Sequence, residues 1–241
     1  MRAIARMLIS SAENSSLDWE AHYAYIEYNV EGNAEENRGY TAGIVGFTSR
    51  TGDLLTVVRR YAEVAPEAEL SRFVPVLAQV NGTASTEGLG RECVAAWQAA
   101  ADDERFRTAQ RDVADELYFE PSLRLAHSDG VGVLGQFIYL DAAVMHGFGT
   151  VDNTVEHIRA AALSRATPPG QGGDEHTWLG VFLDQREEAM RAEVGHSDTT
   201  RVSGMQRVFL AEGNLGLVPP LRWSVYGDRY EISRSDVSGC R

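Results

Sequence analysis

The chain has 241 residues, enough for one large domain or for two small lobes built around a buried core. Hydrophobic residues make up 44% and charged residues 24%, which is the composition of an ordinary folded protein rather than of a disordered one. Acidic residues number 35 against 22 basic residues, all of them arginine, so the formal net charge is −13. This acidity argues against nucleic acid or an anionic membrane as partner, since both require a basic surface. The lack of lysine excludes Schiff-base and P-loop mechanisms.

The predicted elements are mostly helical. Apolar residues at helical spacing predict a first helix over 3–9, aromatic residues alternate over 19–27, and a polar loop or hairpin tip follows over 29–39. Residues 40–47 form either a short strand or a buried turn. Further helices are predicted over 54–64, 69–80, 92–101, 103–118, 131–145, 155–164, 177–194 and 201–212. The tail over 221–232 alternates like a β-strand, or wraps the surface. We therefore expect a mainly α, α+β protein with a small β element near 28–48.

The cysteines, histidines and apolar runs bear on disulfides, metal sites and membrane segments. Cys93 and Cys240 are too few for a disulfide framework, and they either form one bridge or stay unpaired. The histidines show no metal-ligand spacing, so we expect no metal and no cofactor. No run approaches the roughly 18 apolar residues of a membrane span. The opening residues lack the apolar stretch of a signal peptide, so either the protein is cytosolic or the numbering starts after a removed leader.

Two groups of carboxylates are candidates for acid–base chemistry. Glu13 ends the first predicted helix, where partial burial would favour the protonated form that a general acid needs. The alternative is an exposed glutamate at a helix end. Glu35 and Glu36 lie on a polar segment beside Arg38, and a nearby guanidinium favours the charged form that suits a general base. Glycosidases divide the work between two carboxylates in this way.

Ordered motifs along the whole chain resemble glycoside hydrolase family 46, the chitosanases. The segments that carry the resemblance are 10–19 (SSAENSSLDW), 25–27 (YIE), 38–41 (RGYT), 51–53 (TGD), 135–137 (GQF), 139–142 (YLDA), 144–147 (VMHG), 171–175 (QGGDE), 199–202 (TTRV), 206–210 (QRVFL) and 219–221 (PPL). The resemblance implies a lysozyme-like layout: one catalytic domain over 1–241, with a minor lobe over roughly 28–85, a helical major lobe and a substrate cleft between them. It also implies internal cleavage of the β-1,4 links of chitosan, with inversion.

The resemblance implies three catalytic residues. Glu13 falls on the family's general acid, and Thr41 on the threonine that helps to hold the attacking water. The family's general base is an aspartate, whereas this sequence has Glu36 at the matching position and several extra residues shortly before it. Glu35 and Glu31 therefore remain rival candidates for the base. The alternative for Thr41 is a hydroxyl that caps a turn.

Carboxylates in the cleft would pair with the protonated amines of chitosan. The resemblance places Asp53 and Glu193 in this role, and Ser197 stands where the family has an aspartate. Trp19 could face a sugar ring, although aromatic residues at helical spacing are more often core. The full set of expected substrate-binding residues is Arg38, Asp53, Tyr25, Tyr118, Glu193 and His196.

A second set of residues is expected behind the catalytic pair. Asp141, Arg186 and Arg201 correspond to an internal salt-bridge network, in which the loss of one member would strand a buried charge. Trp97 and Trp223 match core tryptophans of the family.

Chitosan and glucosamine oligosaccharides are the partners that the resemblance implies, with a secreted monomer that binds neither nucleic acid nor membrane. Two alternatives stay open. One is a lysozyme-like hydrolase of another amino-sugar polymer. The other is a chitosan-binding protein without activity, because the base position and its surroundings depart from the family pattern.

Overall fold

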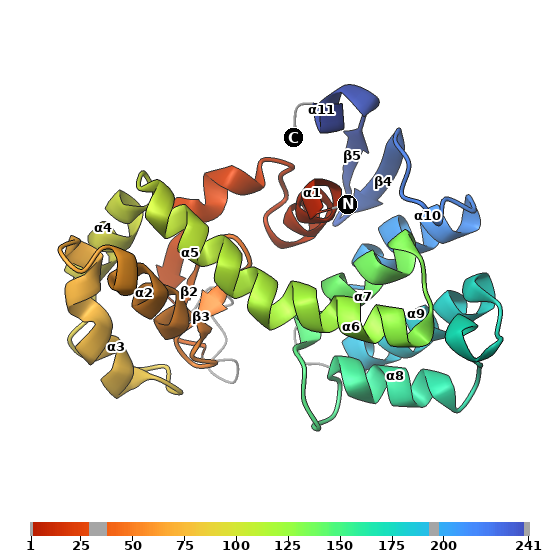
Figure 1. The fold of residues 1–241 in the computed structure, drawn as a ribbon, viewed down its shortest axis with the longest axis horizontal. Helices are drawn as coiled ribbons and strands as arrows, with labels where there is room; N and C mark the ends of the chain where they lie inside the picture. The colour runs from red at the N-terminus through yellow and green to blue at the C-terminus, as the bar shows by residue number, and fades with distance from the viewer. Residues whose placement is uncertain (1, 29–37, 193–197, 239–241) are drawn as a thin grey trace. The chain divides into compact units, whose positions relative to one another are not determined.

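The computed structural model describes residues 2–28, 38–192 and 198–238. Within these ranges the chain is mainly helical, with small antiparallel sheets, which confirms the predicted fold class (Figure 1). The chain divides into two compact units, one of Met1–Leu17 with Tyr118–Arg241 and the other of Asp18–Leu117. The range expected for the minor lobe, 28–85, lies inside the second unit.

The second unit combines a small sheet with short helices. The sheet is antiparallel with strand order β1-β2-β3, and it lies where the β element was predicted. Trp97 is buried in the core of this unit, where its indole N–H donates to the Tyr23 carbonyl at 3.2 Å. The elements are η1 (Trp19–Ala24), β1 (Ile26–Tyr28), β2 (Tyr40–Ala42), β3 (Phe47–Thr48), α2 (Asp53–Val64), η3 (Glu69–Phe73), α3 (Val74–Val80), α4 (Gly90–Ala100) and α5 (Glu104–Ala114).

The first unit is built from helices and a C-terminal hairpin. Its elements are α1 (Arg2–Glu13), α6 (Glu120–Asp129), α7 (Val133–His146), α8 (Val155–Leu163), η5 (Pro169–Gln171), α9 (Glu175–Ala192), η6 (Val202–Gln206), α10 (Arg207–Ala211), β4 (Leu221–Val225), β5 (Asp228–Ile232) and α11 (Arg234–Ser238). A further turn of π-helix, η4 (Asp115–Phe119), runs across the boundary between the units.

Helix α7 forms the centre of the first unit. It is buried over most of its surface and packs against α6 and α8 (Figure 1). Apolar residues all round a helix are typical of a buried position. Gly135 allows close packing, because a Cβ there would lie 3.2 Å from the Leu179 side chain on α9 and closer still to Val131. This buried helix also carries Asp141, so a charged group is held in the centre of an apolar core.

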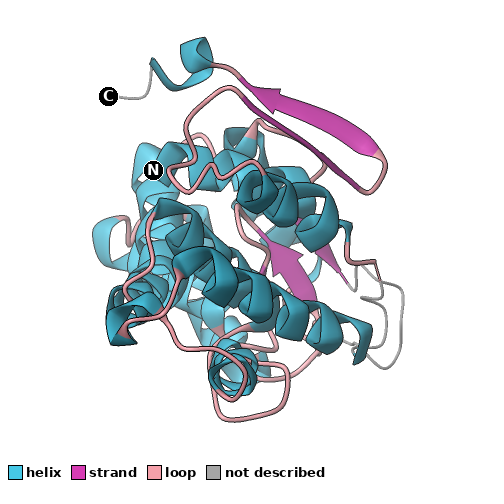
Figure 2. Cartoon of the chain, turned by 90° about the vertical axis from the view of Figure 1, so that its right-hand side faces the viewer, coloured by secondary structure: helices cyan, strands magenta, loops and turns pink. Residues whose placement is uncertain are grey.

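The structure contains one helix that was not predicted, and it decides between the two alternatives for the tail. Helix α6 was not predicted; it continues directly from η4 and has Pro121 as its second residue. The tail, left open between a strand and a surface wrap, forms the β4–β5 hairpin, drawn as magenta strands in Figure 2. Strand β4 alternates between buried and exposed residues, as its sequence pattern indicated.

Candidate active site

Helix α1 carries Glu13 to the surface of the first unit. One face of the helix is buried in the core through residues such as Leu8 and Ala12. The helix ends at Glu13, and Ser15 has the left-handed backbone (φ 50°) common after a helix C-terminus. The Glu13 side chain keeps 29% exposure, so its carboxylate reaches solvent from a rigid support.

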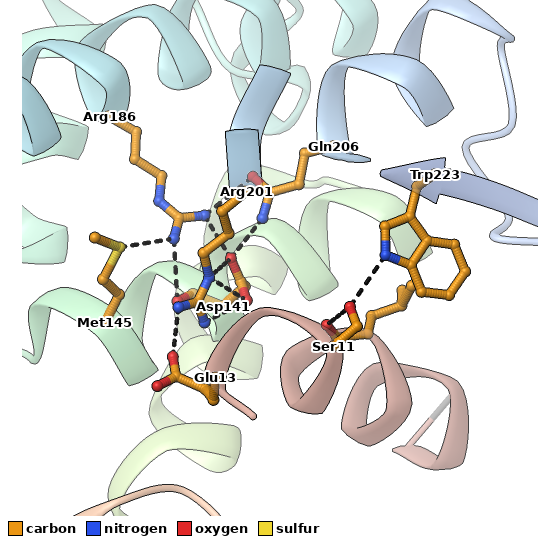
Figure 3. Close-up of polar contacts among 9 residues, drawn as sticks. Ser11, Glu13, Asp141, Met145, Arg186, Arg201, Gln206 and Trp223 are labelled. Atoms are coloured by element: carbon orange, nitrogen blue, oxygen red, sulfur yellow. Dashed lines mark hydrogen bonds and ion pairs between the residues drawn. The ribbon is translucent and has the colours of Figure 1, made fainter. Parts of the chain in front are cut away.

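The last turn of α1 is fixed from the hairpin side. The indole N–H of Trp223, on β4, donates to the Ser11 hydroxyl at 3.0 Å, and this hydroxyl donates to the Leu8 carbonyl at 2.7 Å (Figure 3). Both side chains are buried. Trp223 therefore lies in the core, as expected, and also holds the helix turn that ends in Glu13.

Arg201 links Glu13 to the interior. Its guanidinium binds Asp141 through Nε, at 3.0 and 2.9 Å from the two carboxylate oxygens, and through Nη2, at 2.7 Å from Oδ1. Its remaining nitrogen, Nη1, forms an ion pair with Glu13 Oε1. The side chains of Arg201 and Asp141 are 3% and 0% exposed, so one buried guanidinium bridges two carboxylates (Figure 3).

Arg186 and Gln206 complete the network around Asp141. Arg186 Nη1 donates to Asp141 Oδ2 at 2.8 Å and to the Gln206 side-chain oxygen at 3.0 Å. The Gln206 amide in turn donates to Asp141 Oδ2 at 2.6 Å. The predicted trio of Asp141, Arg186 and Arg201 is thus brought together, while the role of Gln206 was missed. Its signal was an amide within the apolar periodicity of 201–212.

The charges of this network balance. Burial alone would raise the pKa of Asp141, but the two guanidinium groups outweigh burial and lower it to about 2. Burial would lower the pKa of Arg201, and Asp141 and Glu13 reverse this and raise it. For Arg186 burial prevails and, with the like charge of Arg201, lowers the pKa despite Asp141. Two guanidinium groups thus face two carboxylates, which offsets part of the cost of burying the charges.

A second group of predicted residues lies together in the other unit. Thr41, on β2, pairs with Thr48 on β3, and its hydroxyl is buried with no hydrogen-bond partner among the described residues. Asp53 begins α2 and is 7% exposed, with Oδ1 accepting from the Thr48 N–H at 2.7 Å and from the Thr51 hydroxyl at 2.6 Å. Asp53 is therefore held in one orientation rather than being a solvated surface charge.

Some of the remaining predicted site residues lie in the part of the chain that the structure describes, and the others lie outside it. The Arg38 carbonyl accepts from the Arg50 N–H at 3.3 Å, next to β2. Tyr25 donates to Glu27 at 3.2 Å, and Tyr118 is partly buried against the core of the first unit. The predicted residues that lie outside the described ones are Glu31, Glu35, Glu36, Glu193 and His196.

Three further features of the described chain concern its cysteines, its helix lengths and its metal-binding side chains. Cys93 is buried and Cys240 lies outside the described residues, so neither alternative, one bridge or unpaired thiols, is tested. In residues 2–28, 38–192 and 198–238, no helix is long and apolar enough to cross a membrane. The same ranges contain no cluster of three or more residues with metal-binding side chains.

A carboxylate held at a helix end and partly open to solvent can reach a bound substrate, and glycosidases use a pair of such carboxylates for acid–base chemistry. The sequence comparison agrees: the chain belongs to glycosyl hydrolase family 46, whose pattern matches residues 7–221, and it is a glycoside hydrolase. This confirms the resemblance found in the sequence.

Known relatives cover almost the whole chain. A chitosanase of Streptomyces sp. (strain N174) is 50% identical over 232 residues, which are 96% of this chain and 82% of that protein. A chitosanase of Nocardioides sp. (strain N106) is 47% identical over 95% of this chain and 81% of its own length. A chitosanase solved as a co-crystal with substrate is 46% identical, with a TM-score of 0.90 over 96% of both chains.

Proposed function

We propose that the protein hydrolyses the β-1,4 links between glucosamine units of chitosan, cutting inside the chain and inverting the anomeric centre. The observation that carries the proposal is the Glu13 carboxylate, held by Arg201 at the end of a helix whose one face is buried in the core. The similarity to proteins named chitosanases supports the choice of substrate. The net charge of −13 also supports it, since an acidic protein attracts a polycation.

Glu13 is the proposed general acid. Its proton moves to the glycosidic oxygen as the bond from that oxygen to C1 breaks, and Glu13 becomes a carboxylate. Arg201 lies against this carboxylate and stabilises the charge that forms during proton transfer. Asp141 supports the step indirectly, because it fixes the guanidinium through three short contacts.

Glu36 is the proposed general base, with Glu35 and Glu31 as the other candidates. It takes a proton from a water molecule, whose oxygen then bonds to C1 on the face opposite the leaving group. The Thr41 hydroxyl supports this step: it is buried without a hydrogen-bond partner in the described chain, and a hydroxyl both donates to and accepts from water.

The proposed contacts with substrate come from the acidic and aromatic residues singled out in the sequence. Asp53 offers a carboxylate whose orientation is fixed by backbone and hydroxyl donors, which suits pairing with one ammonium group. Arg38, Tyr25, Tyr118, Glu193 and His196 complete the proposed set. We also propose, from the resemblance, that the protein is a secreted monomer without cofactor; sedimentation of the purified chain tests its oligomeric state.

The first experiment measures reducing-sugar release from highly deacetylated chitosan by the wild type, Glu13→Gln, Glu36→Gln and Glu35→Gln. We expect an active wild type, nearly inactive Glu13→Gln and Glu36→Gln, and an active Glu35→Gln, with thermal unfolding as the control for folding. If Glu36→Gln keeps most of its activity, Glu35 or Glu31 is the base. An inactive wild type that still binds chitosan would contradict the proposal.

Substrate and stereochemistry need separate measurements. Fully N-acetylated polymer and peptidoglycan serve as competing substrates, and faster hydrolysis of either would favour the lysozyme-like alternative. Nuclear magnetic resonance of the first products distinguishes the anomers, and an α product from the β-linked polymer demonstrates inversion. A fall in viscosity that precedes most of the sugar release demonstrates internal cleavage.

A further inference from the structure

The tip of the β4–β5 hairpin contains an unusual residue. Val225 pairs with Asp228, so Tyr226 and Gly227 form a two-residue loop, and both have positive φ, 52° and 90°. Positive φ at both central positions defines a type I′ turn, in which asparagine followed by glycine is strongly favoured. A bulky aromatic residue in the left-handed region is an outlier. The turn would form more easily with asparagine in place of Tyr226.

Tyr226 contacts the segment of chain that carries Arg201. Its backbone N–H donates to the Thr200 hydroxyl at 3.0 Å, and Thr200 directly precedes Arg201. Partial burial raises the pKa of its phenol, and the charged groups near enough to act on it are Arg201, Glu13, Asp141 and Asp198. The phenol therefore lies within electrostatic range of the Glu13 carboxylate.

Burial in the core does not explain why a tyrosine stands at position 226. The side chain is 45% exposed, although it is large and apolar over most of its surface. No described residue forms a hydrogen bond with its hydroxyl, whereas the hydroxyl of Tyr230, on the same hairpin, is engaged by Ser15 and Asp228. A strained backbone that presents an exposed aromatic side chain, next to the segment that carries Arg201, is a pattern associated with functional sites.

We infer that Tyr226 is a substrate-binding residue, whose hydroxyl hydrogen-bonds the glucosamine unit next to Glu13 while its ring packs on that sugar. This inference rests on the proposed hydrolysis of chitosan and adds a contact that the sequence analysis did not predict. A phenol both donates and accepts, so it matches a hydroxyl or an ammonium group of the sugar. Aromatic rings with a polar tip are well suited to surfaces that are apolar at one end and wet at the other.

Two substitutions at Tyr226 test the inference. Tyr226→Asn keeps a residue that favours a type I′ turn and removes ring and hydroxyl, while Tyr226→Phe removes the hydroxyl alone. Tyr230→Phe is the matched control, because it deletes a phenol hydroxyl from the same hairpin that is already engaged by Ser15 and Asp228. Steady-state kinetics on a glucosamine hexamer across a pH series, together with the melting temperature, form the readout.

We expect Tyr226→Phe to lower kcat/KM by about three- to tenfold, the usual effect of one hydrogen bond, and Tyr226→Asn to lower it further. The melting temperature of Tyr226→Asn is expected to equal or exceed that of the wild type, since the strain at φ 52° is relieved. Tyr230→Phe is expected to stay within about twofold of wild-type kcat/KM, because its hydroxyl bonds Ser15 and Asp228 of the protein itself rather than the sugar.

Three results would overturn the inference. Wild-type kinetics in a stable Tyr226→Asn would show that the substrate does not contact the side chain. A shift of the basic limb of the pH profile in Tyr226→Phe would show that the hydroxyl acts through Glu13 rather than on the sugar. An equal loss in Tyr230→Phe would point to the hairpin as a whole. A wild type inactive on the hexamer would instead contradict the proposed function.

Discussion

Replacing Arg201 with alanine or lysine tests how the buried network supports Glu13. The guanidinium uses all three nitrogens to span two carboxylates, and its side chain is 3% exposed. Alanine removes the charge and leaves the fully buried Asp141 with Arg186 and Gln206 alone. Lysine keeps the charge, but a single ammonium lacks the planar fork that reaches both partners.

The expected size of the effect follows from burial. Breaking a buried ion pair by removing one partner costs about 3–5 kcal/mol. Because Asp141 keeps a guanidinium and an amide donor, we take about 3 kcal/mol for Arg201→Ala. A chain of this length loses roughly 2–4 °C of melting temperature per kcal/mol, so the expected fall is about 6–12 °C. Arg201→Lys is expected to lose about half as much, since the charge persists.

Calorimetric melting and chitosan hydrolysis, measured on the same preparations, separate stability from activity. Glu13→Gln is the control: it removes the partly exposed end of the network and leaves the pairing of Arg201 with Asp141 intact. We expect it to lose activity with a smaller fall in melting temperature than Arg201→Ala, because Glu13 is partly exposed and Arg201 keeps its pairing with Asp141. If Arg201→Ala keeps both its stability and its activity, the reasoning is refuted.

Two further predictions concern titrating groups in the interior. Asp141 has its pKa lowered from 3.8 to about 2, so its charged state adds about 2 kcal/mol of stability above pH 4, which is lost as the pH falls through 2. Denaturant unfolding between pH 5 and 2 should show a shallower decline in Asp141→Asn. Burial raises the pKa of the Cys93 thiol to about 11, so in a Cys240→Ser variant it should resist alkylation at pH 8 until the protein unfolds. Rapid labelling of the native protein would contradict this.

Periodicity in the sequence predicted most helices well, because each buries one apolar face. The helix expected over 131–145 spans Val133–His146, and the one over 54–64 spans Asp53–Val64. Helix α6 was missed because no apolar periodicity marked it, and its buried residues include a serine and an aspartate besides alanine. Local pattern is therefore informative where one face is apolar, and weak where burial is shared with polar side chains.

The residues of the candidate site could not be predicted from local sequence pattern. Glu13 and Arg201 form an ion pair although they lie 188 positions apart, and no local pattern links two such residues. The resemblance to a family supplied both positions, together with Asp141 and Arg186. It did not supply the strained turn at Tyr226, because φ is a property of the folded chain and the residue lay in no quoted motif.

The position of Gln206 depends on a local irregularity of the backbone. In a regular α-helix, residues five apart point about 140° away from each other, so Arg201 and Gln206 would not both face Asp141. The Arg207 N–H binds the Val202 carbonyl, a five-residue step that makes η6 a turn of π-helix and returns the chain to the same side. The apolar spacing over 201–212 gave no sign of the extra residue.

Gly204 allows this π-turn to lie against β4, which yields a final prediction. A Cβ at Gly204 would overlap the carbonyl oxygen of Ser224, so η6 or β4 must move in Gly204→Ala. Arg201 adjoins η6 and Trp223 lies on β4, and both hold the end of α1, so the shift should displace Glu13. We expect Gly204→Ala to lower the free energy of unfolding by about 1–3 kcal/mol and to lower kcat proportionally more than substrate affinity.

Gly180→Ala on α9 is the control. Its Cβ meets nothing within 4 Å, so the substitution should stabilise the helix by up to about 1 kcal/mol and keep activity. Equal behaviour of the two variants would show that the packing of η6 on β4 does not position the acid.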